Sequence, residues 1–298
     1  MSTAVSDELL TVLERLSFLP EPSDLVALII PDASNPYFTQ LAFELGQRLR
    51  EERLTLIACS SAGVHSRELQ LAAELQRINV KAIFLCACAK FSPQETEALI
   101  RLRLPIIQID RRDASLPFAS VTIDAFEGVK LAVSCLADVG RLRLAAINGP
   151  DGVESSVARR LGFEKSCRER DVAIVDTDTG DFSFASGHAA ATRLIERRGA
   201  MPWTGLFCAN DAMAIGALRA LNEARLNVPG DVAVVGFDAI PIGDWLSPSL
   251  TSVEQPLTKL SEAAVTLLSQ AFRRPPDDHG MRGLDVRVPP QLIRRGST

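Results

Sequence analysis

The sequence predicts an α/β fold with parallel β-sheet, and three observations support the prediction. Short β-branched apolar runs alternate along the chain with longer amphipathic stretches, the pattern of βαβ units. The length of 298 residues exceeds the ~100–200 residues usual for one core, so we expect two lobes or one large α/β domain. With 47% hydrophobic and 23% charged residues, the composition is that of a globular protein rather than a disordered or fibrous one.

The elements follow one another in alternation. Strands are predicted at Leu25–Ile30, Thr55–Cys59, Ala82–Leu85, Ile106–Ile109, Leu144–Ile147, Ala173–Val175, Gly205–Cys208, Val232–Gly236 and Asp285–Val288. Helices are predicted at Tyr37–Glu52, Ser66–Ile78, Pro93–Arg101, Ala125–Val139, Val157–Arg170, Phe184–Arg197, Asp211–Ala224 and Leu257–Phe272. Several of these helices open on a Ser, Asp or Pro suited to a helix start.

Charge and cysteine usage narrow the class of protein. The formal net charge is −5 and no segment concentrates Lys and Arg without nearby acids, so the basic surface of a nucleic-acid reader is not evident. The six cysteines show no CxxC or paired metal spacing and are predicted to be reduced, buried thiols. No secretory signal or membrane span is evident, and a cytoplasmic location is expected.

Polar side chains collect just after the predicted strands, where open parallel sheets bind their ligands. They are Asp32, Ser34, Asn35, Ser60, Ser61, Asp110, Arg111, Asn210, Asp211 and Asp238. Asp32 suits either a helix cap or a ligand contact. At the start of the Asp211 helix we favour Asp211 as the cap and Asn210 as the ligand contact. The Asp238 carboxylate has two equally favoured roles: it accepts hydrogen bonds from ligand hydroxyl groups, or it is solvated in a turn.

Catalytic and metal motifs are not evident in the sequence. It has no GxSxG elbow, no phosphate-binding P-loop and no strand followed by GxGxxG, so we expect no catalytic residues and no cofactor. His65, His188 and His279 have no metal-ligand spacing, and no metal site is predicted. Tyr37 and Phe38, at a helix start, suit either a core role or stacking on a ligand.

Successive blocks of the chain resemble the effector-binding domains of the LacI/GalR family of transcriptional regulators. The blocks are Val26–Phe38, Asp110–Arg112, Thr122–Gly128, Arg159–Phe163, Gly180–Gly187, Cys208–Gly216, Val228–Pro241, Leu250–Pro256 and Pro289–Thr298. The resemblance implies a periplasmic-binding-protein type I fold, in which two Rossmann-like lobes with parallel sheets are joined by three crossovers. The implied first lobe is 24–123 plus 254–282, and the second is 124–253 plus 283–298.

The same resemblance implies that a small-molecule effector binds between the lobes. Its pocket would use Asp32, Tyr37, Phe38, Asp110, Arg159, Phe182, Asn210, Asp238 and Gln255. Carboxylates and amides pair with vicinal hydroxyls, which favours a sugar. Arg159 also suits a carboxylate or phosphate on the ligand, and the aromatics beside Asp32 suit a stacked base.

The front of the chain departs from the family pattern. Family members carry a helix-turn-helix headpiece and a hinge before the first effector strand, whereas residues 1–23 resemble only a remnant helix of that headpiece. Three explanations of this departure remain open. The start of the sequence is mis-set and hides an upstream headpiece, the protein is a paralogue that senses without binding DNA, or it is a regulator that pairs with full-length relatives. Operator DNA is therefore a partner only if an upstream headpiece or such a relative supplies the reader. A transport-type solute-binding protein is the alternative function.

The family resemblance also implies a homodimer through both lobes, with a contact that uses helices of the first lobe. The helices implied in the contact are Leu41–Arg50 and Leu69–Ile78, whose faces alternate apolar and charged residues.

Overall fold

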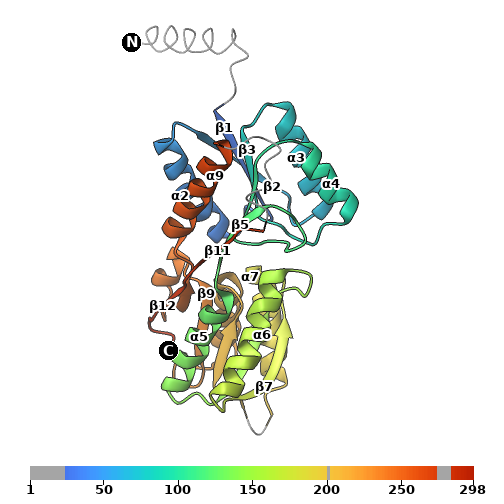
Figure 1. Ribbon diagram of the computed structural model, residues 1–298. Coiled ribbons are helices and arrows are strands. Elements are labelled where there is room, and N and C mark those ends of the chain that lie inside the picture. Colours follow the sequence, from blue (N-terminus) through green and yellow to red (C-terminus); the bar gives the residue numbers. More distant parts are fainter. Residues whose placement is uncertain (1–23, 200–201, 274–282) are drawn as a thin grey trace, which may run out of the picture.

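The computed structural model describes residues 24–199, 202–273 and 283–298. The predicted remnant helix of residues 1–23 lies outside the described residues, as does the 274–282 part of the predicted first lobe. The described chain forms two α/β lobes stacked end to end (Figure 1). Each lobe contains a six-stranded sheet, which confirms the predicted fold class.

The first lobe is built around the sheet β11-β5-β4-β3-β1-β2. Its strands are β1 (Leu25–Ile30), β2 (Thr55–Ser60), β3 (Ala82–Leu85), β4 (Ile106–Ile109), β5 (Ala119–Ile123) and β11 (Asp285–Val288), and its helices are α2 (Pro36–Glu51), α3 (His65–Arg77), α4 (Pro93–Arg101) and α9 (Leu257–Phe272). The chain turns from β2 back to β3 on the other side of β1, so the sheet has a topological switch point between β1 and β3. Ligands of open α/β sheets bind at such points.

The second lobe repeats this plan with the sheet β12-β10-β9-β8-β6-β7. Its strands are β6 (Arg143–Asn148), β7 (Ala173–Thr179), β8 (Gly205–Cys208), β9 (Ala233–Asp238), β10 (Thr251–Glu254) and β12 (Gln291–Ile293); its helices are α5 (Ala125–Asp138), α6 (Glu154–Glu169), α7 (Phe184–Glu196), α8 (Asp211–Glu223) and the short 3-10 helix η1 (Pro241–Trp245). The β10–β12 pair is antiparallel, and β6 lies between β7 and β8 at the switch point of this sheet.

Local sequence explains why these elements start where they do. The side chain of Asn35 accepts a hydrogen bond from the Tyr37 N–H and Pro36 occupies the first turn of α2, which fixes the helix start directly after β1. Ser92 and Glu95 form a reciprocal capping box at the start of α4. The inner strands β3, β4 and β8 are buried at every position, as expected for a sheet covered by helices on both faces.

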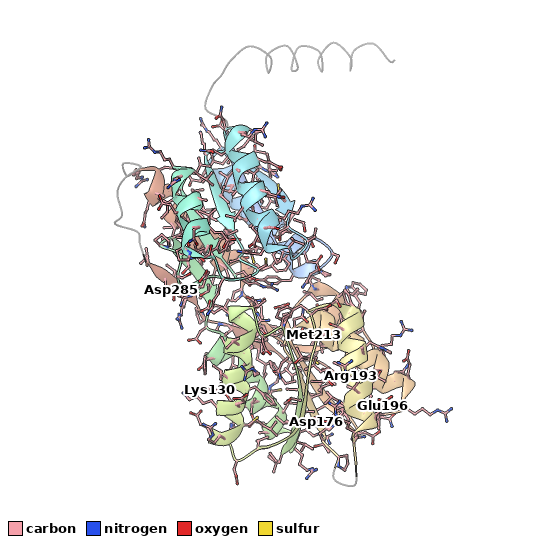
Figure 2. The ribbon with its side chains drawn as sticks, turned by 90° about the vertical axis from the view of Figure 1, so that its right-hand side faces the viewer. Lys130, Asp176, Arg193, Glu196, Met213 and Asp285 are labelled. Carbon is pink, nitrogen blue, oxygen red and sulfur yellow. The ribbon has the colours of Figure 1, made fainter. Side chains whose placement is uncertain are left out.

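The chain passes between the lobes at three points, which agrees with the implied crossovers. The passages are β5 to α5, β10 to α9 and β11 to β12. The third passage corrects the predicted lobe boundary, which placed 283–298 in the second lobe. Strand β11 pairs in parallel with β5 of the first lobe, and the chain enters the second lobe only after Val288. Figure 2 accordingly shows Asp285 at the base of the first lobe.

Three observed strands were missed by the sequence prediction, namely β5, β10 and β12. Each contains polar residues, and β10 buries two of them, Thr251 and Ser252. All six cysteines lie in the described part of the chain and none is in a disulfide. Among the described residues, no helix is both long and apolar enough to cross a membrane.

Candidate ligand-binding site

The nine predicted binding residues gather where the carboxyl ends of the two sheets face each other. Tyr37 lies at the start of α2 after β1, Asp110 directly after β4, and Asp238 at the end of β9. Eight of the nine are buried: Tyr37, Phe38, Asp110, Arg159, Phe182, Asn210, Asp238 and Gln255. Asp32 is half-buried and accepts hydrogen bonds from the amide and hydroxyl of Ser34, so it does not cap α2.

A chain of hydrogen bonds crosses from one lobe to the other through Gln255. The Tyr37 hydroxyl lies 2.7 Å from Oδ1 of Asp110 and 3.1 Å from Oε1 of Gln255, and it can donate to either oxygen. Gln255 Nε2 donates to Oδ1 of Asp238 at 2.7 Å. Because Gln255 stands in the β10-to-α9 crossover, this chain joins the binding residues of both lobes.

Arg159 keeps a donor available in the same region. Its Nη1 donates to the Ala209 carbonyl oxygen at 2.6 Å and lies 3.7 Å from Oδ1 of Asp238. The guanidinium carbon lies 3.8 Å from the centroid of the Phe237 ring. Its Nε is buried and has no hydrogen-bond partner. Since a buried donor is costly to leave unpaired, this atom is suited to an acceptor on a ligand.

Two residues belong with this set that were not predicted as binding residues. Arg111 follows Asp110, and its guanidinium carbon lies 5.3 Å from the ring centroid of Phe38 and 4.8 Å from that of Phe182. It therefore stacks between aromatic rings of the two lobes. Asn148 ends β6, is buried, and has an unpartnered Oδ1. Both residues lie just after the end of a predicted strand, and this position was the sequence signal that could have identified them.

The capping role that the sequence analysis gave to Asp211 is wrong. Asn210 is the N-cap of α8, since its Oδ1 accepts from the Met213 N–H at 3.0 Å while its Nδ2 donates to the Phe182 carbonyl oxygen. Asp211 instead accepts from the Ile240 N–H and the Ser252 hydroxyl, which ties α8 to the ends of β9 and β10. Asn210 shapes the site by holding Phe182.

Two buried carboxylates of the second lobe, Asp238 and Asp211, lie in an environment that favours protonation. Burial raises the pKa of Asp238 to about 7, against the opposing effects of Arg159 and Gln255. Burial and the charge of Asp238 raise the pKa of Asp211 to about 8. Burial and the charge of Asp110 also raise the pKa of the Tyr37 hydroxyl, which keeps it a hydrogen-bond donor.

Three of the predicted binding residues have left-handed backbone conformations. The φ angles are +64° at Asp110, +71° at Phe182 and +113° at Asp238. Non-glycine residues rarely adopt these values, and such strain concentrates at ligand sites in proteins. All three stand on loops or strand ends facing the other lobe.

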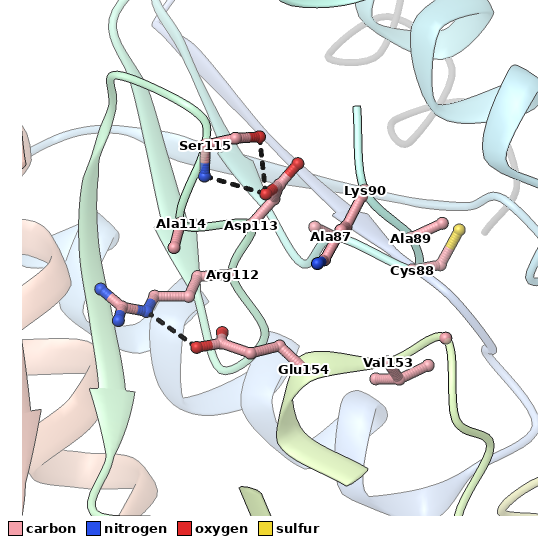
Figure 3. A pocket seen from close by; sticks show the side chains of 11 residues that line it. Ala87, Cys88, Ala89, Lys90, Arg112, Asp113, Ala114, Ser115, Val153 and Glu154 are labelled. Atoms are coloured by element: carbon pink, nitrogen blue, oxygen red, sulfur yellow. Dashed lines mark hydrogen bonds and ion pairs between the residues drawn. The ribbon is translucent and has the colours of Figure 1, made fainter. Parts of the chain in front are cut away.

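A cavity of about 200 Å³ opens between the lobes beside this cluster (Figure 3). Its walls come from the 87–90 and 112–115 segments of the first lobe and from 152–154 of the second. Nε of Arg112 lies 3.4 Å from Oε1 of Glu154 across the lobes. None of the nine predicted residues lines this cavity. The predicted residues instead pack against one another in the buried cluster described above.

Comparison with known proteins agrees with this architecture. A family model described as a periplasmic binding protein-like domain matches residues 133–298. An uncharacterized HTH-type transcriptional regulator in the aml 5′ region of Streptomyces limosus is 31% identical, over 92% of this chain and 78% of its own length. The ribose operon repressor of Halalkalibacterium halodurans is 27% identical, over 100% and 89% of the two chains.

Solved structures give the same result. A LacI family transcriptional regulator from Enterococcus faecium, crystallised with bound ribose, superposes with a TM-score of 0.80 at 25% identity, over 92% of this chain and 98% of that one. The fold, the family model and the regulators that match nearly the whole chain together show that the chain belongs to the LacI family of transcriptional regulators and contains its periplasmic binding protein-like effector domain.

Proposed function

We propose that this protein is a transcriptional regulator whose effector is a sugar or a closely related small polyol, bound between the two lobes. The observation that carries the proposal is the buried cluster in which Asp110 of the first lobe and Asp238 of the second are joined through Tyr37 and Gln255. Carboxylate and amide oxygens that converge from two lobes are suited to the vicinal hydroxyls of a sugar.

The remaining contacts of a sugar would come from the same cluster. The unpartnered Nε of Arg159 would donate to a ring or hydroxyl oxygen. Phe38 and Phe182, which now hold the Arg111 guanidinium between them, would cover an apolar face of the ring once Arg111 swings aside. Ribose is named for two of the similar proteins, one by its repressor title and one by its bound ligand, which supports a pentose as the first candidate.

The proposed response is a change in how the two lobes sit relative to each other. In the described structure, direct side-chain links such as Arg112–Glu154 and Gln255–Asp238 join the lobes. A ligand that replaces some of these links would favour one lobe arrangement by its differential affinity for it. That shift would be transmitted to operator DNA only if an upstream headpiece or a full-length relative supplies the DNA-binding part.

A thermal-shift screen tests the proposal. The melting temperature of the full chain is measured with pentoses, hexoses, their phosphates, polyols and nucleosides. A ligand that binds only the native state increases its stability by RT ln(1 + [L]/Kd) and so raises the melting temperature. We expect a pentose or hexose to raise it. Asp238→Asn should abolish that shift, whereas Asp176→Asn, in the Arg197 ion pair on the far side of the second lobe, should preserve it. A shift that survives Asp238→Asn would move the site elsewhere.

A nucleobase is the second candidate, supported by the stacking of Arg111. A planar guanidinium already lies between Phe38 and Phe182, and a planar base could take the same place. The same screen separates the two candidates, because a nucleoside effector would raise the melting temperature while the matching pentose alone would not.

We further propose a cytoplasmic homodimer that contacts through the outer faces of α2 and α3. Phe43 on α2 is 63% exposed and Ile78, just after α3, is 53% exposed. Exposed large apolar side chains on one lobe are suited to a symmetric contact. The six cysteines without disulfides are consistent with a reducing compartment.

A further inference from the structure

We propose that His65, Glu68 and Cys88 of the first lobe form a binding site for one zinc-like divalent cation. The three side chains come from the start of α3 and from the loop after β3. One imidazole nitrogen, one carboxylate oxygen and one sulfur lie within 4.8 Å of one another. The proposal is independent of the effector, since none of the three belongs to the predicted ligand cluster.

The three atoms are arranged much as tetrahedral zinc requires. Ligand atoms about 2.0–2.3 Å from zinc stand roughly 3.3–3.6 Å apart, so the widest pair would need to close by only about 1 Å. Nδ1 of His65 is already 3.1 Å from Oε2 of Glu68. The Cys88 N–H donates to the other carboxylate oxygen, Oε1, at 2.9 Å, which holds the Cys88 loop against the helix.

A carboxylate lies near the second ring nitrogen of His65, although the two atoms are not hydrogen-bonded. Nε2 of His65 lies 3.4 Å from Oε2 of Glu95, which is held in turn by the capping box with Ser92. The ring also packs edge-on against Phe91, with centroids 4.5 Å apart. A carboxylate on one ring nitrogen orients the other toward a metal and raises its basicity.

The cluster has an unmet need for positive charge. A neutral imidazole carries one proton, yet both ring nitrogens of His65 face carboxylates, and Nε2 is buried without a hydrogen-bond partner. The Glu68 side chain is fully buried. A cation at Nδ1 would balance the buried Glu68 carboxylate.

The donor set selects the kind of metal. Sulfur with imidazole favours zinc and similar transition metals over magnesium or calcium, which prefer all-oxygen sites. Three protein ligands leave a fourth position for water or another small ligand. Cys88 also lines the cavity between the lobes, so the bound cation would stand next to that space. The His65-x-x-Glu68 spacing alone is a weak sequence signal for a metal site, because Cys88 lies 20 positions further along the chain and is brought beside Glu68 by the fold.

Cobalt titration of the full chain tests the site. After treatment with a chelator and a reductant, Co²⁺ should bind at one equivalent and give a thiolate-to-cobalt charge-transfer absorption, which Zn²⁺ displaces and Mg²⁺ does not. Cys88→Ser should abolish the absorption, while Cys59→Ser, a half-buried cysteine of the same lobe, should retain it. Glu95→Gln should weaken zinc affinity about 10–100-fold. Substoichiometric binding, or an absorption that survives Cys88→Ser, would overturn the proposal.

A second readout avoids dependence on a variant that fails to fold. Zinc should protect Cys88 of the unmodified chain from alkylation by iodoacetamide, measured by peptide mass spectrometry, and should leave the alkylation of Cys59 unchanged. Equal alkylation of Cys88 with and without zinc would reject the site even if Cys88→Ser is unstable.

Discussion

Nη1 of Arg159 lies 3.7 Å from Oδ1 of Asp238, beyond hydrogen-bond distance, while the same nitrogen donates to the Ala209 carbonyl oxygen at 2.6 Å. The guanidinium thus faces a buried carboxylate without bonding to it directly. Both side chains are almost fully buried, so neither gains much from water. This arrangement leaves Arg159 able to bind a ligand while it supports the second lobe.

Replacement of Arg159 should therefore affect both binding and stability. Arg159→Ala is expected to weaken effector binding by ~1.5–3 kcal/mol, the scale of a hydrogen bond to a charged group. It should also lower the free energy of unfolding by about 1–3 kcal/mol, because Phe237 loses its stacking partner and Ala209 its donor. Calorimetric titration and urea unfolding measure the two effects. An unchanged effector affinity would remove Arg159 from the site.

Asn210 should act through the helix start and through Phe182. Asn210→Ala removes the N-cap of α8, which costs about 1 kcal/mol, and leaves the Phe182 carbonyl without its donor. Asn210→Asp keeps an acceptor for the cap but loses the donor, so its effect on the melting temperature should be smaller and its effect on effector binding similar. Equal melting temperatures for Asn210→Ala and the unmodified chain would contradict the capping role.

Asp211 should make stability fall as pH rises. Its pKa is raised from 3.8 in the unfolded reference to about 8 in the fold, so the native state binds more protons than the unfolded state between these values. The stabilising contribution is fully present below about pH 4 and is lost as pH rises through about 8. Asp238, with a pKa raised to about 7, acts in the same direction.

Asp211→Asn should remove part of this dependence. Asparagine can accept from the Ile240 N–H as Asp211 does, and its amide nitrogen can donate to the Ser252 hydroxyl oxygen, from which Asp211 accepts. Relative to the unmodified chain, the variant should gain on the order of a few kcal/mol of unfolding free energy between pH 5 and pH 8. Urea unfolding at both pH values measures this, with the exposed Asp151→Asn as control. A parallel pH dependence of variant and unmodified chain would show that Asp211 is ionised throughout.

Gly236 should not tolerate a side chain. A Cβ at this position of β9 would lie 2.1 Å from Oδ1 of Asp211. Hydrogen bonds to both carboxylate oxygens hold the Asp211 side chain in place. Gly236→Ala should lower the free energy of unfolding by about 1–3 kcal/mol, the range for overpacked cores. Gly152→Ala, where no heavy atom lies within 4 Å of the added Cβ, is the matched control and should be close to neutral.

Phe43 should contribute to self-association through the first lobe. Phe43→Glu places a charge on the exposed face of α2 and should weaken a dimer at least ~10-fold, about 1.4 kcal/mol. Sedimentation equilibrium across a concentration series gives the dissociation constant. Phe126→Glu, on an exposed part of α5 in the second lobe, should leave it unchanged. A monomeric unmodified chain would disprove the proposed dimer.

Sequence alone determined the α/β plan, because strand and helix periods and helix-start residues are local properties of the chain. The strands β1, β3, β4, β8 and β11 and the helices α4 and α9 have the bounds predicted for them. Polar residues after buried strands also indicated which side chains lie close together in the predicted ligand cluster, since the carboxyl ends of parallel strands meet at one edge of a sheet.

Tertiary structure decided what depends on contacts between distant segments. The sheet that receives β11 follows from pairing with β5, more than 160 positions away in the chain. The strands β5, β10 and β12 were missed because their polar residues are satisfied by remote partners, as with Thr251 and the carbonyl oxygen of Arg295. Asn210 and Asp211 both fit the local capping rule, and burial against β9 and β10 chose between them. The sequence therefore determined which residues stand at strand ends, whereas packing determined the partner of each side chain, because hydrogen bonding and burial depend on neighbours that local patterns do not specify.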